Sequence, residues 1–338
     1  MSDPHTPPLR LGIVGSGLIA SVTARAATAA AGCDVVAVSA RRLEVAQAFA
    51  TEHGIERAFD DWNALLACPA VDAVYVATPN HTHRALVEAC AAAGKPVLCE
   101  KPMATRWQDG LRMIKACDDA RVLLLVVKQN RHNATLQLLK RAVEEKRFGR
   151  IHLVHMNVFW TRPQSYYDQA KWRGTWEFDG GAFMNQASHY IDLFDWLIGP
   201  VERVQAMMST THDIEVEDTG VMNVRWRNGA LGSMSVTMLT YPANLEGSIT
   251  ILGEKGTAKI GGVAVNEIEL WKFDTPADYD ERVHDATYET TSVYGLGHPL
   301  YYANVVDVLR GTCEPHTDGR EGLKSLELLV AAYLSARD

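Results

Sequence analysis

The chain has 338 residues, a length that predicts two domains rather than a single hydrophobic core. Apolar residue types make up 47% of it and charged types 22%, which is typical of folded domains and excludes a disordered or collagen-like chain. Because 33 basic residues stand against 41 acidic ones, for a net charge of −8, we expect no nucleic-acid partner and no binding to an anionic membrane surface.

The cysteines and the N-terminal residues indicate a cellular compartment. The six cysteines form no Cys-x-x-Cys pair, and five lie within the first 117 residues in apolar segments, as reduced core thiols do. The first residues lack the apolar segment of a signal peptide, and the longest strongly apolar stretch, 122–127, is too short to cross a bilayer. We therefore expect a cytoplasmic protein.

From residue 9 to residue 127, short β-branched runs alternate with Ala- and Leu-rich stretches. This alternation predicts βαβ units, and strands that are apolar throughout predict a parallel sheet covered on both faces. We therefore expect an α/β domain with the doubly wound Rossmann fold over residues 1–128. The expected strands are 9–14, 35–39, 73–77, 97–99 and 123–127, and the expected helices are 19–31, 43–53, about 81–93 and a stretch through 114.

The pattern changes after residue 128. One amphipathic helix, 135–146, leads into long strands, and Asn228-Gly229 between two of them indicates a hairpin. We expect residues 129–338 to form an α+β domain on a large, mostly antiparallel open sheet, which binds substrate and joins copies of the chain into a dimer or tetramer. The expected strands are 151–159, 201–208, 219–226, 231–238, 248–252 and 267–273, followed by helices near 300–310 and after 319.

A glycine-rich turn follows the first expected strand and opens the first helix: Gly12-Ile-Val-Gly15-Ser-Gly17-Leu18-Ile19-Ala20. Gly15 permits the tight turn, and Gly17 lets a pyrophosphate approach the backbone at the helix N-terminus. The second expected strand ends in Ser39-Ala40-Arg41-Arg42. An NAD site has an aspartate or glutamate at this point, about 20 residues after the glycines, to bind the adenosine ribose, and this chain has none there. Two guanidinium groups there favour NADP(H), although NAD(H) is possible and the arginines could instead decorate an exposed helix start.

Polar residues follow two further strands at the sheet edge where such folds bind ligands. Thr78-Pro79-Asn80-His81-Thr82-His83 comes after one strand, and Glu100-Lys101-Pro102 after the other. The two histidines lack a third ligand at suitable spacing, so we expect a polar helix cap beside the cofactor and no metal. Lys101 could reach into the same crevice or remain a surface ammonium.

In the second half, Gly180-Gly181 precedes a helix on which Asn185 and His189 share one face, as positions four residues apart do. Histidine suits proton transfer near neutral pH, although a lone helix histidine is more often structural. An aromatic and basic loop lies just before it, with Arg162, Tyr166 and 171–173, and such groups bind sugars and anions.

These residues together resemble the Gfo/Idh/MocA family of nicotinamide-dependent sugar and cyclitol oxidoreductases over essentially the whole chain. The blocks 128–131, 159–167, 171–176 and 180–189 are similar to the subgroup of UDP-N-acetyl-2-amino-2-deoxyglucuronate 3-dehydrogenases. Asn185 stands where most of the family has an aspartate, which removes an ionised partner of the histidine at that position. Ala40 with Arg41 also departs from the acid expected in NAD-using members.

The resemblance implies hydride transfer at a pyranose carbon bearing a hydroxyl, with a sugar or nucleotide sugar as substrate. It implies His189 as the base, Lys101 as the group that stabilises the alkoxide, and Asn185 as an orienting group. The implied substrate contacts are Lys101, Arg131, Arg162, Tyr166, Asn185 and His189. The implied cofactor contacts are Gly15, Gly17, Leu18, Ile19, Ser39, Arg41, Arg42, Thr78, Asn80, His83, Glu100, Lys101, Gln129, Trp172 and Arg173.

Three other functions fit parts of the sequence. An NADPH-dependent reductase or dehydrogenase of a free sugar would suit Arg41 and Arg42 better. A non-catalytic NADP-binding regulator would not need Lys101 together with His189. A glycosidase that oxidises its substrate transiently would show no net change in nicotinamide absorbance.

Overall fold

The computed structural model describes residues 7–30, 32–290 and 293–337. It divides into two compact units, the first made of residues 1–129 and 298–326 and the second of residues 130–297 and 327–338. Ala31, the last residue of the first expected helix, lies outside the described residues. No helix in the described part of the chain is long and apolar enough to cross a membrane.

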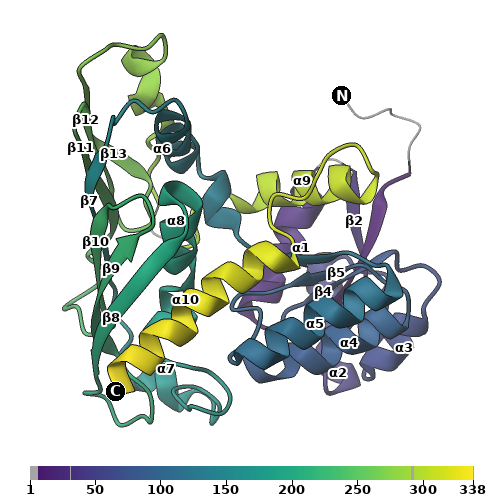
Figure 1. Cartoon of the computed structure of the whole chain (residues 1–338). Helices are drawn as coiled ribbons and strands as arrows, with labels where there is room; N and C mark the ends of the chain where they lie inside the picture. The colour runs from purple at the N-terminus through teal and green to yellow at the C-terminus, as the bar shows by residue number, and fades with distance from the viewer. Residues whose placement is uncertain (1–6, 31, 291–292, 338) are drawn as a thin grey trace. The chain divides into compact units, whose positions relative to one another are not determined.

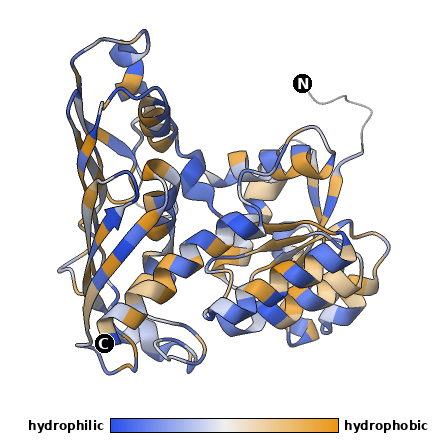
Figure 2. Ribbon diagram, viewed as in Figure 1, coloured by the Kyte–Doolittle hydropathy of each residue, from blue (hydrophilic) through white to orange (hydrophobic). Residues whose placement is uncertain are grey.

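The first unit is built on a six-stranded parallel sheet in the order β3-β2-β1-β4-β5-β6. Its central strands are apolar on both faces (Figure 2), and Leu11, Ile13 and Tyr75 are fully buried. This confirms the doubly wound Rossmann fold, whose strand order reverses between β1 and β4 and thereby opens a crevice at the carboxyl ends of these strands. The strands are β1 (Leu9–Val14), β2 (Cys33–Ser39), β3 (Arg57–Phe59), β4 (Ala73–Val76), β5 (Val97–Cys99) and β6 (Leu124–Val126).

Helices cover both faces of this sheet, with α1 against α9 on one face and α4 against α5 on the other (Figure 1). The short elements β3 and α3 were not expected, because residues 57–67 are too few for a clear periodic pattern. The helices are α1 (Leu18–Ala29), α2 (Leu43–His53), α3 (Trp62–Ala67), the 3₁₀ turn η1 (Asn80–Thr82), α4 (His83–Ala92), α5 (Trp107–Ala120) and α9 (His298–Leu309).

The chain returns to the first unit near its C-terminal end. The Tyr302 hydroxyl on α9 donates to Thr23 Oγ1 at 2.9 Å, and the Val126 N–H donates to the Thr317 carbonyl at 2.8 Å. We expected residues 129–338 to form one continuous second domain, whereas 298–326 belong to the first unit. The reason is the apolar face of α9, where Tyr301, Tyr302 and Val305 are buried in the core of the nucleotide-binding fold.

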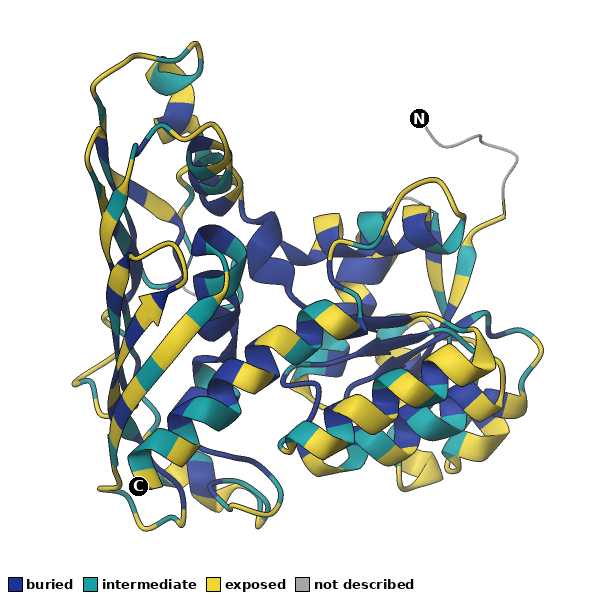
Figure 3. Ribbon diagram, viewed as in Figure 1, coloured by how far each residue is buried: buried dark blue, intermediate teal, exposed yellow. Residues whose placement is uncertain are grey.

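The second unit is built on a seven-stranded sheet in the order β13-β12-β11-β7-β10-β9-β8, antiparallel except for the β7–β10 pair. Buried and exposed residues alternate along β9 (Figure 3), so the sheet has a covered face and an open face. Gly229, with φ of +89°, lies in the tight turn between β9 and β10, which confirms the hairpin. The strands are β7 (Ile151–Phe159), β8 (Val201–Ser209), β9 (Thr219–Trp226), β10 (Leu231–Thr237), β11 (Glu246–Gly253), β12 (Gly256–Gly261) and β13 (Glu267–Phe273).

Short helices line the covered face; the Trp226 ring of β9 packs edge-on against Phe194 of α8 at 5.2 Å. The last helix, α10, ends in this unit, where the Ala206 N–H donates to Ser335 Oγ at 3.1 Å. The helices are η2 (Gln129–His132), α6 (Ala134–Glu144), α7 (Gln164–Asp168), the π-helix η3 (Ala182–Gln186), α8 (Ser188–Ile198), η4 (Asp280–Ala286) and α10 (Gly319–Arg337).

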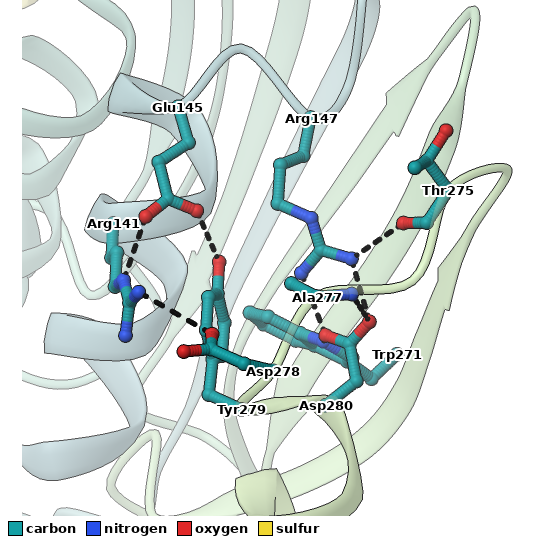
Figure 4. A network of polar contacts seen from close by, with 9 residues as sticks. All are labelled: Arg141, Glu145, Arg147, Trp271, Thr275, Ala277, Asp278, Tyr279 and Asp280. Carbon is teal, nitrogen blue, oxygen red and sulfur yellow. Dashed lines mark hydrogen bonds and ion pairs between the residues drawn. The ribbon is translucent and has the colours of Figure 1, made fainter.

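A polar network fastens the segment after β13 to the end of α6 (Figure 4). Arg147 binds both carboxylate oxygens of Asp280, at 2.6 and 2.7 Å, and the Trp271 indole N–H donates to the same carboxylate. These hydrogen bonds lower the pKa of Asp280 to about 2, and the bond from Arg147 has the largest effect. Asp280 is therefore ionised at any pH at which the protein is used, and the network holds η4 in place.

Candidate active site

The glycine turn brings β1 close to the loop after β4. Gly15 has φ of +116°, and a Cβ at this position would lie 2.4 Å from the Ala77 carbonyl oxygen. Its N–H donates to the Ser39 carbonyl at 2.8 Å, which ties the turn to the end of β2. A side chain at residue 15 would therefore clash with backbone that cannot move away, and only glycine fits.

The N-terminus of α1 is open. Gly17 is the N-cap, no side chain caps it, and a Cβ there would meet no atom within 4 Å. Leu18 is exposed and Ile19 half-buried, whereas Ala20 is fully buried against the sheet. Uncapped N–H groups at a helix start that borders open space are suited to bind a diphosphate.

A hollow of about 470 Å³ lies beside this turn, lined by Ser16, Ala40, Arg41, Arg42 and Val45. The two arginines are exposed, so their guanidinium groups can reach a bound anion. Ser39 is buried, and its carbonyl accepts the Gly15 N–H. The Ser39 backbone thus shapes the turn, and the expected contact of its hydroxyl with the cofactor stays a prediction.

The loop after β4 is fixed by its own side chains. The hydroxyls of Thr78 and Thr82 are 2.6 Å apart, and Asn80 is buried. His83 is fully buried, and its ring nitrogens lie 2.9 Å from the Thr78 carbonyl and 3.0 Å from the Pro102 carbonyl. Burial lowers the pKa of His83. His83 therefore braces this loop against the loop after β5, and its expected contact with the cofactor stays a prediction.

Glu100 orients the backbone at Lys101. The Lys101 N–H donates to Glu100 Oε2 at 3.0 Å, while Oε1 accepts a hydrogen bond from the Tyr75 hydroxyl. Burial raises the pKa of Glu100, and the Tyr75 hydrogen bond and the charge of Lys101 oppose that rise. Lys101 itself is half-buried at the carboxyl end of β5, and Gln129, another expected cofactor contact, is buried just after β6.

In the second unit, Asn185 lies in a π turn and not in a regular α-helix. The Ala187 N–H donates to the Ala182 carbonyl at 2.8 Å, five residues back, and α8 begins only at Ser188. Asn185 thus lies in the π turn, and His189 lies in the first turn of α8. Single π turns inside helices are rare overall, and those that occur often lie at functional sites.

Asp179 holds the Asn185 side chain. Asn185 Nδ2 donates to Asp179 Oδ1 at 2.5 Å, and the Gly174 N–H donates to Asp179 Oδ2 at 2.8 Å. Since Asp179 is buried and accepts at both oxygens, it fixes which edge of the amide faces away from it. A carboxylate therefore lies beside Asn185 although residue 185 itself is no longer an acid.

Arg131 is bound within the protein. Its guanidinium donates twice to Asp192, at 2.7 Å each, and lies over the Trp196 ring. Arg131 is only 4% exposed, and its expected contact with the substrate carboxylate or diphosphate stays a prediction. Asp192 lies three residues after His189 on α8, so this bidentate ion pair holds the helix that carries the expected base.

Two expected substrate contacts, Arg162 and Tyr166, meet around Gln186, together with two expected cofactor contacts, Trp172 and Arg173. Arg162 Nε donates to Gln186 Oε1 at 3.2 Å, and Gln186 Nε2 donates to the Tyr166 hydroxyl at 3.1 Å. The Arg173 guanidinium lies 4.1 Å from the centre of the Tyr166 ring and 4.9 Å from that of Trp172. Two cations and two half-buried aromatic rings thus meet beside the π turn, which suits an anionic sugar.

The sequence-based prediction missed Asp179, Gln186, Glu217 and Tyr333. Asp179 and Gln186 lie next to motif residues, so their position was a usable signal. Glu217 and Tyr333 bind the backbone of the π turn from far along the chain. Glu217 is 34 positions from Phe183, and Tyr333 is at least 149 positions from the residues that it binds, so no local pattern indicates either of them. Among the described residues, no three His, Cys, Asp or Glu side chains are placed to hold a metal ion.

Two family models match the chain. "Oxidoreductase family, NAD-binding Rossmann fold" covers residues 9–128, and "Oxidoreductase family, C-terminal alpha/beta domain" covers residues 140–338. Myo-inositol 2-dehydrogenase of Thermotoga maritima is 31% identical over 66% of this chain and 67% of its own length.

Two solved structures are more similar. The WlbA dehydrogenase of Bordetella pertussis, in complex with NADH and UDP-GlcNAcA, is 58% identical over 98% of this chain and 96% of that one, with a TM-score of 0.95. The WlbA dehydrogenase of Chromobacterium violaceum, with the same two ligands, is 57% identical over 99% and 95%, with a TM-score of 0.93. The chain belongs to the Gfo/Idh/MocA family of oxidoreductases.

Proposed function

We propose that this protein is a nicotinamide-dependent dehydrogenase of a UDP-linked N-acetylamino-uronate and acts at the 3-position of the sugar ring. The observation that carries the proposal is the similarity, at 57–58% identity over nearly the whole chain, to two dehydrogenases solved with NADH and UDP-GlcNAcA. Arg162, Arg173 and Tyr166 support it, since the cluster that they form around Gln186 offers charge and ring surface to such a substrate.

The first unit fits a dinucleotide. The open N-terminus of α1 at Gly17 is suited to the diphosphate, and Lys101 lies at the carboxyl end of β5, on the far side of β4 from β1 in the same sheet. A bound nicotinamide would supply the acceptor for the hydride of the sugar carbon.

The protein side chains handle the proton and the developing charge. His189 takes the proton of the 3-hydroxyl, and Lys101 donates a hydrogen bond to the oxygen as negative charge develops on it. Asn185, held by Asp179, orients the sugar or the imidazole. The same groups act in the opposite sense when a ketone is reduced.

For the dinucleotide, we propose that NADP(H) is accepted through Arg41 and Arg42, which line the hollow beside the glycine turn. The NADH in both similar structures supports NAD(H) as the alternative. The Arg41→Ala variant separates the two. If the guanidinium binds a 2′-phosphate, kcat/KM falls about 10-fold with NADP(H) and stays unchanged with NAD(H). An equal change with both dinucleotides would contradict this role.

The decisive experiment pairs each dinucleotide with UDP-GlcNAcA, UDP-GlcNAc and free sugars, and follows nicotinamide absorbance. We expect kcat/KM for UDP-GlcNAcA to exceed that for UDP-GlcNAc by about 10- to 100-fold. The reason is that UDP-GlcNAc lacks the carboxylate with which an arginine of the site would pair. Turnover of free sugars alone would replace the proposal by the NADPH-dependent sugar reductase. Dinucleotide binding without turnover of any substrate would indicate the regulator.

We also propose a cytoplasmic dimer or tetramer. Leu252, Leu153 and Leu231 lie side by side across β11, β7 and β10, and Met207 pairs with Val221 on the same sheet; all five are exposed. An apolar sheet face of this kind is typical of an interface between copies. All six cysteines are free, as in a reducing compartment. Light scattering that gives a monomer mass would contradict the assembly.

A further inference from the structure

The backbone at the start of the π turn is held by two residues, Glu217 and Tyr333, from distant parts of the second unit. Four successive N–H groups, from Gly181 to Met184, all donate to Glu217 or Tyr333. The Ala182 N–H donates to the Glu217 carbonyl at 2.9 Å and the Phe183 N–H to Glu217 Oε1 at 2.9 Å. The N–H groups of Gly181 and Met184 each donate to the Tyr333 hydroxyl at 3.2 Å.

The Tyr333 phenol can satisfy these contacts in one way only. A phenol oxygen has one proton to donate and two lone pairs to accept with. Since two N–H groups occupy the lone pairs, the proton goes to Glu217 Oε1, 2.7 Å away. Glu217 Oε1 must then accept from both Tyr333 and Phe183. The arrangement therefore has a single hydrogen-bond direction, which ends at the carboxylate.

Shape enforces the same arrangement. Glu217 is 3% exposed, and a Cβ on residue 181 would lie 1.9 Å from its Oε2, so only glycine allows the carboxylate to approach. Tyr333 packs edge-on against Trp176 at 5.6 Å, in the loop that also carries Trp172 and Arg173. The start of a helical segment is normally left with unpaired N–H groups, and here the π turn has none left over among these four.

We propose that Glu217 and Tyr333 are positioning residues for the dehydrogenase reaction: by capping the π turn they fix the register of Asn185 and the start of the helix that carries His189. This inference rests on the proposed function. It adds two groups that bind the backbone of the π turn, and it gives α10 a role in positioning the reactive groups. A shift of about 1 Å at reacting groups costs on the order of 100-fold in rate, so loss of the cap has a measurable effect.

The experiment compares Tyr333→Phe, Glu217→Leu and Glu217→Gln with wild type. Tyr333→Phe and Glu217→Leu remove an acceptor, so kcat with UDP-GlcNAcA should fall about 10- to 100-fold while KM for the dinucleotide stays unchanged. Glu217→Gln keeps an acceptor oxygen and should remain within about 3-fold of wild type. The primary deuterium isotope effect on kcat should rise in the two damaged variants, because hydride transfer becomes slower than the other steps.

Tyr190→Phe is the matched control. Tyr190 follows His189 directly, and its buried hydroxyl has no hydrogen-bond partner among the described residues, so the variant removes a phenol without removing a cap. Its kcat and isotope effect should equal those of wild type. A merely structural role for Glu217 and Tyr333 would lower the melting temperature and the active fraction, yet leave kcat per active site and the isotope effect unchanged, and that result would overturn the proposal.

Amide hydrogen exchange gives a readout that needs no substrate. In Tyr333→Phe, the amides of Gly181 and Met184 should exchange at least about 10-fold faster than in wild type and Tyr190→Phe, because their acceptor is gone. Equal exchange rates would overturn the capping role whatever the kinetics. If wild type turns over no UDP-sugar, the proposed function falls, and the exchange comparison still decides whether Glu217 and Tyr333 cap the turn.

Discussion

Two helix starts of this chain treat their backbone N–H groups in opposite ways. At Gly17, the start of α1 has no side-chain cap and no acidic residue in its first turn, and a Cβ at this position would meet no atom within 4 Å. At Gly181, the start of the π turn has its N–H groups occupied by Glu217 and Tyr333. The first start is open to an anion, whereas the second is closed by the protein itself.

This difference separates binding from positioning. An open helix start offers unpaired donors and the positive end of the helix dipole to a ligand, and it gains its partners only when the ligand arrives. A closed start gains nothing from a ligand but holds its side chains in one place beforehand. The dinucleotide needs the first kind, and groups such as Asn185 and His189, which act on a reacting carbon, need the second.

The largest effect should come from removing the two proposed reactive groups, His189 and Lys101. His189→Asn removes the base and Lys101→Met removes the ammonium, so each should lower kcat about 10²- to 10⁴-fold. Initial-rate kinetics with UDP-GlcNAcA measure this. His152→Asn and Lys115→Met, at exposed positions, are controls that should turn over normally. Full turnover in His189→Asn or Lys101→Met would show that the assigned roles are wrong.

A second variant converts the open start into a closed one. Gly17→Asp places a carboxylate at the N-cap of α1, where φ of −85° suits any residue and a Cβ meets nothing within 4 Å. The aspartate should raise stability by only about a few tenths of a kcal/mol as a cap, because glycine is itself well tolerated at an N-cap. It should also weaken dinucleotide binding about 100-fold, because its charge occupies and repels the diphosphate site.

Gly17→Ser is the control for that change. It caps the helix without charge, so it should stabilise the fold and weaken binding less than aspartate does. Thermal unfolding and fluorescence titration with NADH and NADPH give both quantities. Unchanged dinucleotide affinity in Gly17→Asp would mean that the diphosphate binds elsewhere.

The same contrast explains which parts of the fold could be predicted. The bounds of β1, β5, β7 and β9 match the expected ranges residue for residue, because apolar runs and alternation are local properties of the strands. β12 was missed, since Gly256, Lys259 and Gly261 break its pattern within six residues. The return of α9 to the first unit depends on what its apolar face packs against, which periodicity does not reveal.

For the site, the local motifs indicate the proposed reactive groups, but they do not indicate the contacts that hold those groups in place. The glycine turn, Lys101, Asn185 and His189 carry their spacing in the sequence. The burial of Arg131 does not show there, because it depends on Asp192, 61 residues away. The cap on the π turn likewise joins segments from three places along the chain, and only the folded structure brings them together.

A third prediction concerns how Asn185 is held in the closed turn. In Asp179→Asn, the new side chain has one acceptor oxygen in place of two, so it can accept from Asn185 Nδ2 or from the Gly174 N–H but not from both. Either its NH₂ group then faces one of these donors, or the Asn185 amide turns over to present its oxygen. We expect kcat to fall about 10-fold with an unchanged KM for the dinucleotide. Asp168→Asn, which alters an exposed carboxylate bonded to Gln164, is the control. Equal kcat in both variants would remove Asp179 from the site.

The smallest effect tests the charge that closes the turn. Burial raises the pKa of Glu217 to about 7, while the hydrogen bonds from Phe183 and Tyr333 oppose the rise and the neighbouring Asp218 adds to it. Because the folded protein holds this proton more tightly than the unfolded chain, the stability that it contributes is greatest below pH 4.5 and is lost as the pH rises toward 7.

Between pH 6 and pH 8, wild type should therefore lose about 1 kcal/mol of unfolding free energy relative to Glu217→Gln, whose amide does not titrate. Urea unfolding of both proteins across this range measures the difference, and other titrating groups cancel in the comparison. A difference that stays flat with pH would mean that Glu217 is ionised throughout, as strongly solvated carboxylates are. The closed turn would then owe its rigidity to a fixed charge, and the two helix starts would differ only in whether that charge comes from the protein or from the ligand.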